Sequence, residues 1–575
     1  MFRFESTCQV RAFRMDSSLL TVVFVVLCCA SVNAVTVSTG VGDIVGIQSS
    51  YKNAFVNKFL GIPYAEPPTG DLRFRPPVPK RRFAAPYSAD KSGAPCIQNP
   101  SVIKSVPHQN MSEDCLSLDV YVPAGGEAKK AVMVWIYGGA FVSGASFLYD
   151  ATKMAAIGDV IVVTLNYRLG VFGFFTTGDA NASGNYGLQD QQLALIWVKM
   201  NIGSFGGDQN RVTIFGQSAG AASVSWQMLV PSNQGLFHRV IGQSGGASCP
   251  WALPDPKTTS EYMKRLTRTV GCAGYKSSEV VACLRKLPAK AFGQELAIWP
   301  HSDSQNPRTP AGPRVDGKFI PTSPNCREPS VDFLLGSNRF EGSPFLEWYI
   351  GTYLLATGTS LYNGVPESAF NHIAQGLGGL NNSDSIKQFI GDSMFYRSIM
   401  KFANGHAASS TRSTYFYSFL HKPSRLISPL SVGVSIAPYV NGSIHGDELA
   451  FFFAPGYVWL SPGLTTAGEK KLSDVMIKYW TNFARSGNPN IPAAVPHQWP
   501  KYKVDQKKFI EFNIKNDQLD LRNSSSYRSQ YMSYWDDIQP RLPSLCVAKP
   551  SAASSTSPSA LLVAILIAAI LKLIQ

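Results

Sequence analysis

Hydrophobic runs in the middle of the chain alternate between strand-like and helix-like patterns. Arg211–Phe215 is a β-branched run typical of a buried strand, and Ala219–Val230 carries small and apolar residues at helical spacing until Pro231 ends it. A second strand-like run follows at His238–Ile241. A strand, a crossover helix and another strand predict a βαβ unit, so we expect these two strands to be parallel neighbours.

Two further runs extend this pattern. Val132–Tyr137 is expected to be a strand that enters a glycine-rich turn at Gly138–Phe141, and Asp332–Gly336 is expected to be a late strand. The chain has 575 residues, of which 45% are hydrophobic and 16% charged, which is ample for a large core. Because no fixed-period repeat or long low-complexity linker divides it, we predict an α/β fold in one catalytic unit with irregular insertions.

Two pentapeptides fit the pattern G-x-S-x-G, namely Gly216–Gly220 and Gly242–Gly246. This pattern lifts a serine nucleophile out of a sharp turn between a strand and a helix. Ser218 has both flanking elements, whereas Ser244 is followed by GGASCPWALPDP, whose prolines exclude a long helix. The pattern therefore favours Ser218 as the nucleophile, with Ser244 as a buried hydroxyl close behind it.

A serine nucleophile needs oxyanion donors, an imidazole base and a carboxylate that orients the imidazole. The turn after Val132–Tyr137 can direct the backbone N–H groups of Gly139 and Ala140 to one point, together with that of Ala219. His445 lies between flexible residues and an apparent helix start, as expected for a base in a loop after the sheet. Four of the other histidines that follow the serine are alternatives, although a lone histidine is more often structural: His372, His406, His421 and His497.

Three carboxylates are candidates for the orienting acid. Glu341 follows the strand Asp332–Gly336, so it lies near the carboxyl edge of the sheet, where such sites gather. Asp332 and Glu448 are the alternatives. Side chains and backbone supply all of this chemistry, so no cofactor and no metal are expected.

The charge of the chain limits its partners. The formal net charge of +14 falls to +12 when residues 1–34 and Lys572, each contributing +1, are removed. No Lys/Arg run resembles a nucleic-acid-binding stripe, so we expect a basic surface and no nucleic acid. The serine chemistry above, and not the charge, is what suits a small-molecule ester substrate. The oligomeric state is not predicted.

Both ends resemble processing signals. Leu19–Ala30 is a short apolar run after two arginines, and Val32–Ala34 has small residues suited to a signal peptidase, so residues 1–34 are expected to be a secretory signal. Residues 35–545 then form the catalytic domain. In residues 546–575 a polar spacer precedes the apolar tail Ala560–Gln575, which predicts a GPI anchor attached within Ser551–Ser555 rather than a membrane-spanning tail. We expect the protein at the outer face of the plasma membrane, or secreted.

Cysteines and glycosylation sequons agree with that compartment. Seven of the ten cysteines remain after the signal, and two pairs are close enough for local loop closure, Cys96 with Cys115 and Cys272 with Cys283. Three remain, of which at least one must be free or intermolecular: Cys249, Cys326 and Cys546. Five sequons are candidate glycosylation sites: Asn110, Asn181, Asn381, Asn441 and Asn523.

With these motifs assembled, the chain resembles the carboxylesterase/cholinesterase family of α/β-hydrolases over about residues 35–545. The segments that carry the resemblance are Gly61–Pro77, Ser112–Pro123, WIYGGAF, Asn166–Phe174, Gly184–Leu195, VTIFGQSAG, SCPW, Glu341-Gly342 and His445-Gly446. The resemblance implies the α/β-hydrolase fold, with a large, mostly parallel, twisted sheet flanked by helices.

The same resemblance assigns roles to individual residues. It implies that Ser218, Glu341 and His445 form a catalytic triad and that Gly139, Ala140 and Ala219 form the oxyanion hole. Ser244 becomes a buried hydroxyl behind the triad, and the disulfides pair as Cys96–Cys115 and Cys272–Cys283. Arg73 is expected to pair with Glu113.

Departures from the family pattern bear on the substrate. Members that act on choline esters carry a tryptophan in the loop closed by the first disulfide, but Ile97–Asp114 has no aromatic residue. Those members have glutamate before the serine, where this chain has neutral Gln217, and a net charge of +12 would repel a cation. Ala140 replaces a glycine of the usual hole. Gln217, Arg73-Phe74 and Asp190-Gln191 also resemble juvenile hormone esterases and related invertebrate esterases.

The sequence therefore predicts a surface-anchored serine carboxylesterase for neutral, apolar esters, not a typical cholinesterase. Two alternatives stay open. One is a tethered, cholinesterase-like adhesion or ligand-binding protein, because some family members have lost triad residues and bind partner ectodomains. The other is an esterase that sequesters xenobiotics by acylation with slow turnover.

Overall fold

The computed structural model describes eleven ranges of the chain: 34–99, 111–126, 129–274, 276–296, 311–322, 331–344, 387–388, 390–409, 411–424, 441–453 and 464–529. Residues 1–33 of the expected signal 1–34 and all residues from 530 onward, which include the expected anchor site, lie outside these residues, whereas Ala34, after which cleavage is expected, is the first residue of β1. No helix in the described ranges is both long enough and apolar enough to cross a membrane.

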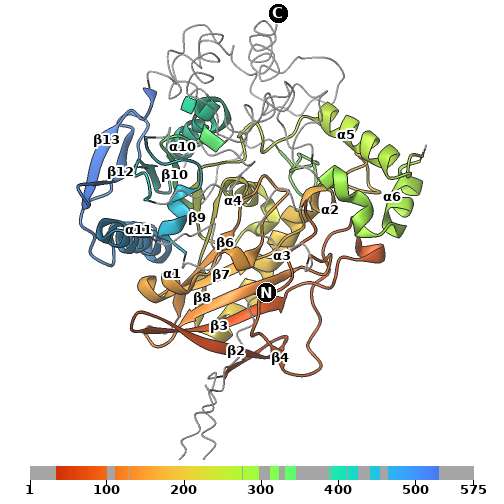
Figure 1. Cartoon of the computed structure of the whole chain (residues 1–575), viewed down its shortest axis with the longest axis horizontal. Helices are drawn as coiled ribbons and strands as arrows, with labels where there is room; N and C mark the ends of the chain where they lie inside the picture. Colours follow the sequence, from red (N-terminus) through yellow and green to blue (C-terminus); the bar gives the residue numbers. More distant parts are fainter. Residues whose placement is uncertain are drawn as a thin grey trace, which may run out of the picture.

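Thirteen strands in these ranges form one sheet (Figure 1). Their order is β1-β2-β3-β5-β7-β6-β8-β9-β10-β11-β12-β13, and β4 pairs with β2. The strands are β1 Ala34–Thr39, β2 Gly42–Tyr51, β3 Ala54–Pro63, β4 Tyr87–Ser88, β5 Ser117–Pro123, β6 Lys130–Ile136, β7 Ile161–Leu165, β8 Gly207–Gln217, β9 Arg239–Gln243, β10 Asp332–Asn338, β11 Thr414–Phe419, β12 Lys508–Lys515 and β13 Gln518–Ser525.

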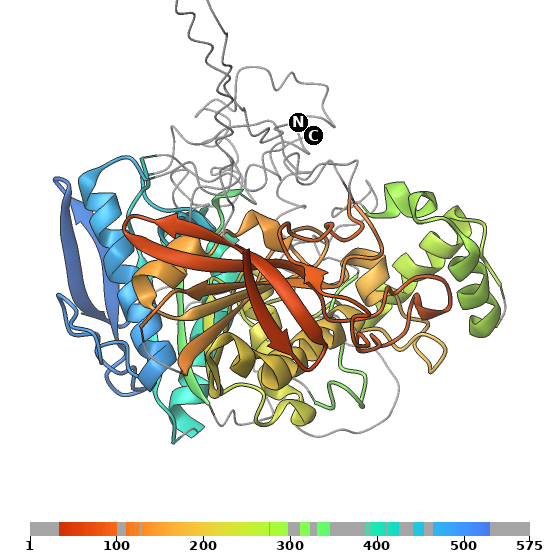
Figure 2. The same cartoon turned by 90° about the horizontal axis from the view of Figure 1, so that it is seen from below.

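Helices cover both faces of the sheet. They are α1 Thr152–Gly158, α2 Gly170–Phe174, α3 Tyr186–Asn201, α4 Ala219–Leu229, α5 Pro256–Thr269, α6 Ser277–Lys286, α10 Arg397–Ser409 and α11 Ala467–Ser486. On one face α1 packs against α11, and on the other α3 packs against α4. The helices α5 and α6 lie together at one side of the molecule, opposite β13 (Figures 1 and 2).

The centre of the sheet is parallel, and its strands are buried on both faces. Every step from β7 through β6, β8, β9, β10 and β11 to β12 is parallel, while β1, β2, β3, β5 and β7 pair antiparallel, as do β12 and β13. All residues of β6 and β7 are buried, which explains their continuous apolar runs. The expected α/β-hydrolase architecture is confirmed.

The predicted βαβ unit is present. β8 and β9 are adjacent and parallel, with Gly216 opposite Gly242 and Gln217 opposite Gln243, and α4 connects them. The helix ends at Leu229, one residue earlier than expected, because Pro231 lacks the N–H that would continue it. The carboxyl ends of both strands, each followed by a serine, therefore meet at one edge of the sheet.

Helix α11 shows how local sequence sets an element's limits. At its start the Thr466 hydroxyl accepts a hydrogen bond from the backbone N–H of Glu469, whose carboxylate accepts one from the backbone N–H of Thr466. At its end Gly487 takes a left-handed conformation with φ of 78°. The helix packs against β6, β8, β12 and β13, and Trp480 on its buried face donates to the side chain of Gln243 at 3.1 Å.

Two disulfides hold the amino-terminal half, Cys96–Cys115 and Cys272–Cys283, as expected. Cys249 is buried and free, and burial raises the pKa of its thiol to about 12, so it is unreactive at neutral pH. Cys326 and Cys546 lie outside the described residues. Three predicted sequon asparagines are exposed, Asn181, Asn441 and Asn523, whereas Asn110 and Asn381 lie outside the described residues.

The expected pair of Arg73 and Glu113 is present next to the first disulfide. The Arg73 guanidinium donates to both carboxylate oxygens of Glu113, at 2.7 and 2.6 Å. It also donates to the carbonyls of Leu284 and Leu287, at 2.8 and 2.6 Å. One buried guanidinium thus ties together the first disulfide loop and the end of α6, and its donors are directed at fixed acceptors.

Candidate active site

Ser218 lies on a strained turn between β8 and α4. Its φ is 58° and its ψ is −123°, a conformation that L-residues rarely adopt. Both glycines of the pentapeptide are required by close contacts. A Cβ on Gly216 would lie 2.5 Å from the backbone of Gly220, and a Cβ on Gly220 would lie 1.9 Å from the carbonyl oxygen of Ile136 in β6. The turn that lifts out the hydroxyl is therefore held by the neighbouring strand.

Ser244 occupies the equivalent turn after β9, but it is enclosed. Its φ is 55° and its side chain is fully buried, whereas Ser218 is partly exposed. The Ser244 hydroxyl has no hydrogen-bond partner among the described residues. A Cβ on Gly245 would lie 2.5 Å from the Ser218 carbonyl oxygen, so this second turn packs directly behind the first.

The glycine-rich turn after β6 faces Ser218. A Cβ on Gly138 would lie 2.9 Å from the Cβ of Ser218. Gly139 has φ of 113° and Ala140 has φ of 56°, so the turn is built on left-handed residues. Across the turns and loops that the structure describes, the N–H groups of Gly139 and Ala140 donate to no backbone carbonyl. The N–H of Ala219 is the first of α4 and has no partner within the helix. Three donors are thus available beside Ser218.

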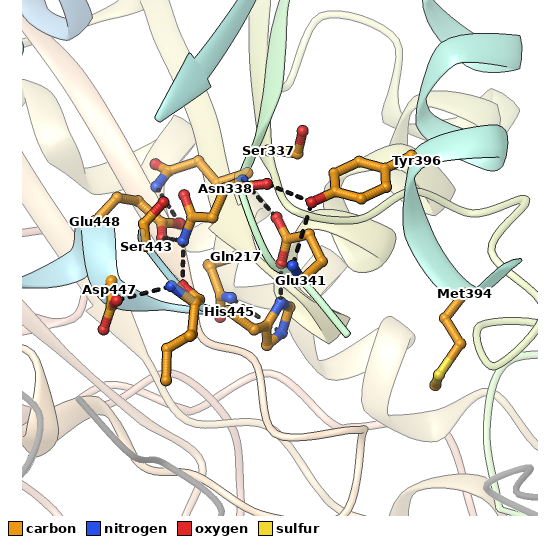
Figure 3. Close-up of polar contacts among 12 residues, drawn as sticks. Gln217, Ser337, Asn338, Glu341, Met394, Tyr396, Ser443, His445, Asp447 and Glu448 are labelled. Carbon is orange, nitrogen blue, oxygen red and sulfur yellow. Dashed lines mark hydrogen bonds and ion pairs between the residues drawn. The ribbon is translucent and has the colours of Figure 1, made fainter. Parts of the chain in front are cut away.

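The loops that carry Glu341 and His445 are joined to each other. A short bridge pairs Phe340 with Ile444, one residue before each of these two side chains. The Nδ1 atom of His445 lies 2.5 Å from Oε2 of Glu341, and both side chains are buried (Figure 3). The carboxylate fixes the ring's orientation and places the proton on Nδ1, which leaves Nε2 as an acceptor.

The imidazole also contacts the end of β8. Its Nε2 atom lies 3.1 Å from the side-chain nitrogen of Gln217, the residue before Ser218. The ring of Phe395 packs against the other side, with ring centres 4.7 Å apart. The lone pair of His445 is therefore directed toward the strand end that carries the partly exposed serine. A base directed there can accept a hydroxyl proton.

Sequence reasoning missed the residues that hold Glu341. Its Oε1 accepts a hydrogen bond from the backbone N–H of Asn338 at 2.6 Å, and its own N–H donates to the hydroxyl of Tyr396 at 3.2 Å. That hydroxyl lies 2.6 Å from the carbonyl oxygens of Asn338 and Arg339. Asn338 ends a buried strand, and a polar residue there was the one available signal.

A second carboxylate lies within the same network. The side-chain amide of Asn338 donates to Oε2 of Glu448 at 2.5 Å and to the carbonyl of Ile444 at 2.6 Å (Figure 3). Glu448 is fully buried, and burial together with the nearby Glu341 carboxylate raises its pKa to about 7. It contacts Asn338 and Gln243, whereas the carboxylate at Nδ1 of His445 is that of Glu341.

The other candidates from the sequence lie elsewhere. Asp332 is the first residue of β10, at the opposite end from Glu341, where it accepts from the backbone N–H of Ser413 and lies 3.8 Å from Arg239. His406 is bound to Thr414 and to the carbonyl of Val331, and His421 is bound to Glu469. His497 precedes Trp499 far along the chain, and His372 lies outside the described residues. Within the described ranges, no group of His, Cys, Asp and Glu could hold a metal ion.

Comparison with known proteins extends this picture. Residues 32–535 match the sequence model of the carboxylesterase family. The chain is 35% identical over 545 residues to an acetylcholinesterase from Bungarus fasciatus, covering 88% of this chain and 86% of that protein. It is 34% identical over 578 residues to an acetylcholinesterase from Danio rerio, covering 88% of each, and 32% identical over 547 residues to a cholinesterase from Mus musculus, covering 88% and 87%. The matched residues include every described strand and the whole candidate site.

Proposed function

Because this chain belongs to the carboxylesterase family and is a carboxylic ester hydrolase, we propose that it cleaves neutral, apolar esters with Ser218 as nucleophile, His445 as base and Glu341 as the orienting acid. The observation that carries the proposal is the 2.5 Å contact between Glu341 and Nδ1 of His445, with Nε2 directed toward the Ser218 turn. That arrangement suits proton transfer from a serine hydroxyl.

The chemical steps follow from the three groups. The Ser218 oxygen attacks the ester carbonyl carbon while Nε2 of His445 accepts its proton. The developing oxyanion is stabilised by the N–H groups of Gly139, Ala140 and Ala219, which have no competing backbone acceptors in the described turns. The alcohol leaves with the proton from His445, and a water activated by the same nitrogen then releases the carboxylic acid.

Three features support a neutral substrate rather than a choline ester. The segment Ile97–Asp114 has no aromatic side chain to stack on a quaternary ammonium, and Gln217 adds no negative charge beside the base. The net charge of +12 after removal of the end segments opposes the approach of a cation. The relatives named acetylcholinesterase and cholinesterase share the family, and the choice of alcohol depends on residues at which this chain differs from the choline-ester pattern.

A matched pair of acetate esters tests this proposal. 3,3-Dimethylbutyl acetate is the neutral isostere of acetylcholine, with carbon in place of the charged nitrogen. We expect kcat/KM to be about 10-fold higher for the neutral ester, because a desolvated cation–π contact worth about 2 kcal/mol is missing and the surface repels the cation. Raising the ionic strength should increase the acetylcholine rate and leave the neutral rate unchanged.

The two rates distinguish the substrate proposal from the esterase proposal. Acetylcholine cleaved as well as its isostere would contradict the neutral-substrate proposal, and cleavage of neither ester would contradict the esterase proposal. A second neutral pair that differs only in acyl length controls for the size of the acyl pocket.

We also propose that the protein is exported and held at the cell surface by a glycolipid. The two disulfides and the exposed sequons Asn181, Asn441 and Asn523 support an oxidising, secretory route. For the full chain expressed on cells, we expect a phosphatidylinositol-specific phospholipase C to release esterase activity into the medium. Deletion of residues 560–575 should give a secreted enzyme. Activity that stays on the cells after the phospholipase would indicate a membrane-spanning tail instead.

A further inference from the structure

The side chain of Gln217 occupies the acceptor nitrogen of the base. Its amide nitrogen lies 3.1 Å from Nε2 of His445, and the side chain is 5% exposed (Figure 3). On its other side the amide oxygen is close to the glycine-rich turn, since a Cβ on Gly138 would lie 3.1 Å from it. The amide is thus enclosed between the turn and the imidazole, with its nitrogen toward the ring.

The direction of this hydrogen bond follows from the other ring nitrogen. Glu341 lies 2.5 Å from Nδ1 of His445, and a carboxylate is an acceptor, so the ring proton is on Nδ1. In a neutral imidazole the remaining nitrogen carries a lone pair. The Gln217 N–H therefore donates to Nε2 of His445. The lone pair that it occupies is the one that must receive the proton of Ser218.

We propose that Gln217 is a positioning residue that occupies this lone pair in the free enzyme and favours the neutral imidazole, which extends esterase activity to lower pH. A donor directed at Nε2 stabilises the neutral ring and opposes its protonation by solvent. When Ser218 transfers its proton, the amide must release the nitrogen. The inference rests on the proposed roles of Ser218 and His445.

Other charged groups around His445 favour protonation of its ring, whereas Gln217 opposes it. Glu341 accepts from Nδ1, and Glu448 and Asp447 lie just after the histidine in the 3₁₀ helix Asp447–Phe451. Their negative charge favours a protonated ring. Burial raises the pKa of Glu448 to about 7, so its charge is only partly present near neutral pH.

In the described part of the chain, two further elements bring uncharged groups to the ring or to Glu341 beside it. The π-helical turn Asp392–Tyr396 contributes Phe395 and the hydroxyl of Tyr396, whose pKa burial raises well above its ordinary value. The loop after β9 contributes the thiol of Cys249, which is neutral because burial raises its pKa to about 12. The Arg528 guanidinium pairs with Asp392 and stacks on the ring of Tyr396. Gln217 is therefore the group on β8 that opposes protonation of His445.

The pH dependence of kcat/KM for a neutral ester tests the inference. We compare the wild-type enzyme with Gln217→Leu, which removes the donor, and with Gln217→Glu, an isosteric variant that adds charge. The midpoint of the acidic limb should rise by about half to one pH unit in Q217L, the effect of one hydrogen bond. In Q217E it should rise by about one to two units, because a carboxylate favours the protonated ring.

Gln243→Leu is the matched control. Gln243 faces Gln217 in the sheet register and also precedes a serine, but its amide contacts Glu448 and Trp480. The midpoint of the acidic limb should not rise in this variant. If the midpoint rose as much in Gln243→Leu as in Q217L, the rise would reflect the loss of any buried amide near the site. That result would overturn the inference.

Two further results would also overturn it. A fall in kcat/KM at all pH values with an unmoved midpoint would indicate a merely structural role for Gln217. A lower midpoint in Q217L would mean that the amide oxygen accepts from a protonated ring. Reaction of each variant with a fluorophosphonate shows that the site is folded, and Q217E keeps the test valid if Q217L does not fold. If the wild type hydrolyses the ester but the Gln217 variants have the same midpoint as the wild type, only the role of Gln217 is rejected. If the wild type does not hydrolyse the ester, the proposed function is rejected.

Discussion

Replacing Ser218 by alanine is expected to lower kcat/KM for p-nitrophenyl acetate by about 10⁴- to 10⁶-fold. The substitution removes the only atom proposed to bond to the acyl carbon, while the backbone donors of Gly139, Ala140 and Ala219 remain. Residual hydrolysis above the uncatalysed rate is expected from these donors. Steady-state rates of the purified ectodomain measure the loss, and the fold is checked by the thermal unfolding midpoint.

The matched control is Ser244→Ala in the second pentapeptide. The Ser244 hydroxyl is buried and lacks a hydrogen-bond partner among the described residues, so its removal should change the rate by less than about 10-fold. A fluorophosphonate should label Ser218 in the wild type and in S244A and should leave S218A unlabelled. An unlabelled wild type would favour the adhesion alternative, and labelling with a burst but little steady-state product would favour xenobiotic sequestration.

Replacing Glu341 by glutamine is expected to lower kcat by about 10⁴-fold, the effect of neutralising the acid of a Ser-His-acid triad. The amide keeps the shape of the side chain but can present an N–H to Nδ1 of His445, which favours the wrong tautomer. It also removes the charge that stabilises the imidazolium formed during acyl transfer. The loss should appear in kcat more than in KM, since the carboxylate is buried behind the ring.

The other two carboxylates are the controls for Glu341. Asp332→Asn should leave kcat within about twofold, because Asp332 is at the opposite end of β10 and contacts Ser413 and Arg239. Glu448→Gln should have an intermediate effect, because Glu448 is hydrogen-bonded to Asn338, whose N–H holds Glu341, and its charge acts on Glu341 without being the carboxylate at Nδ1 of His445. If E448Q lost as much activity as E341Q, or E341Q kept most of its activity, the assignment of the acid would be wrong.

Local patterns were sufficient to predict the elements around Ser218. The runs at Arg211–Phe215 and His238–Ile241 became the parallel neighbours β8 and β9, and Ala219–Val230 became α4 with an error of one residue. These features are readable because side-chain periodicity, the missing N–H of proline and the freedom of glycine act over a few residues. The observed strands are longer than the predicted ones at their ends, because pairing with a neighbouring strand adds residues such as Gln217 to β8.

The network behind Glu341 could not be predicted in this way. Asn338 and Tyr396 contact each other across 58 positions, and neither belongs to a local pattern. Their contacts arise because the π-helical turn Asp392–Tyr396 packs where β10 ends. The 3.1 Å contact between Gln217 and His445 could not be predicted from local patterns either, because the two residues are 228 positions apart.

By itself the sequence determined that Ser218, not Ser244, has a strand before it and a helix after it, and that glycines surround it. It also determined that the chain is basic and that Ile97–Asp114 contains no aromatic residue, the two features on which the proposal of a neutral substrate depends. Only the tertiary structure decided which carboxylate meets His445. Sequence order favours Glu341 over Asp332, because Glu341 follows the strand that Asp332 begins, but it leaves open Glu448, three residues after the histidine. That choice depends on how the loops at the carboxyl edge of the sheet pack together, which pairs Phe340 with Ile444 and brings Glu341 to Nδ1 of His445, and such contacts between distant segments follow no local pattern.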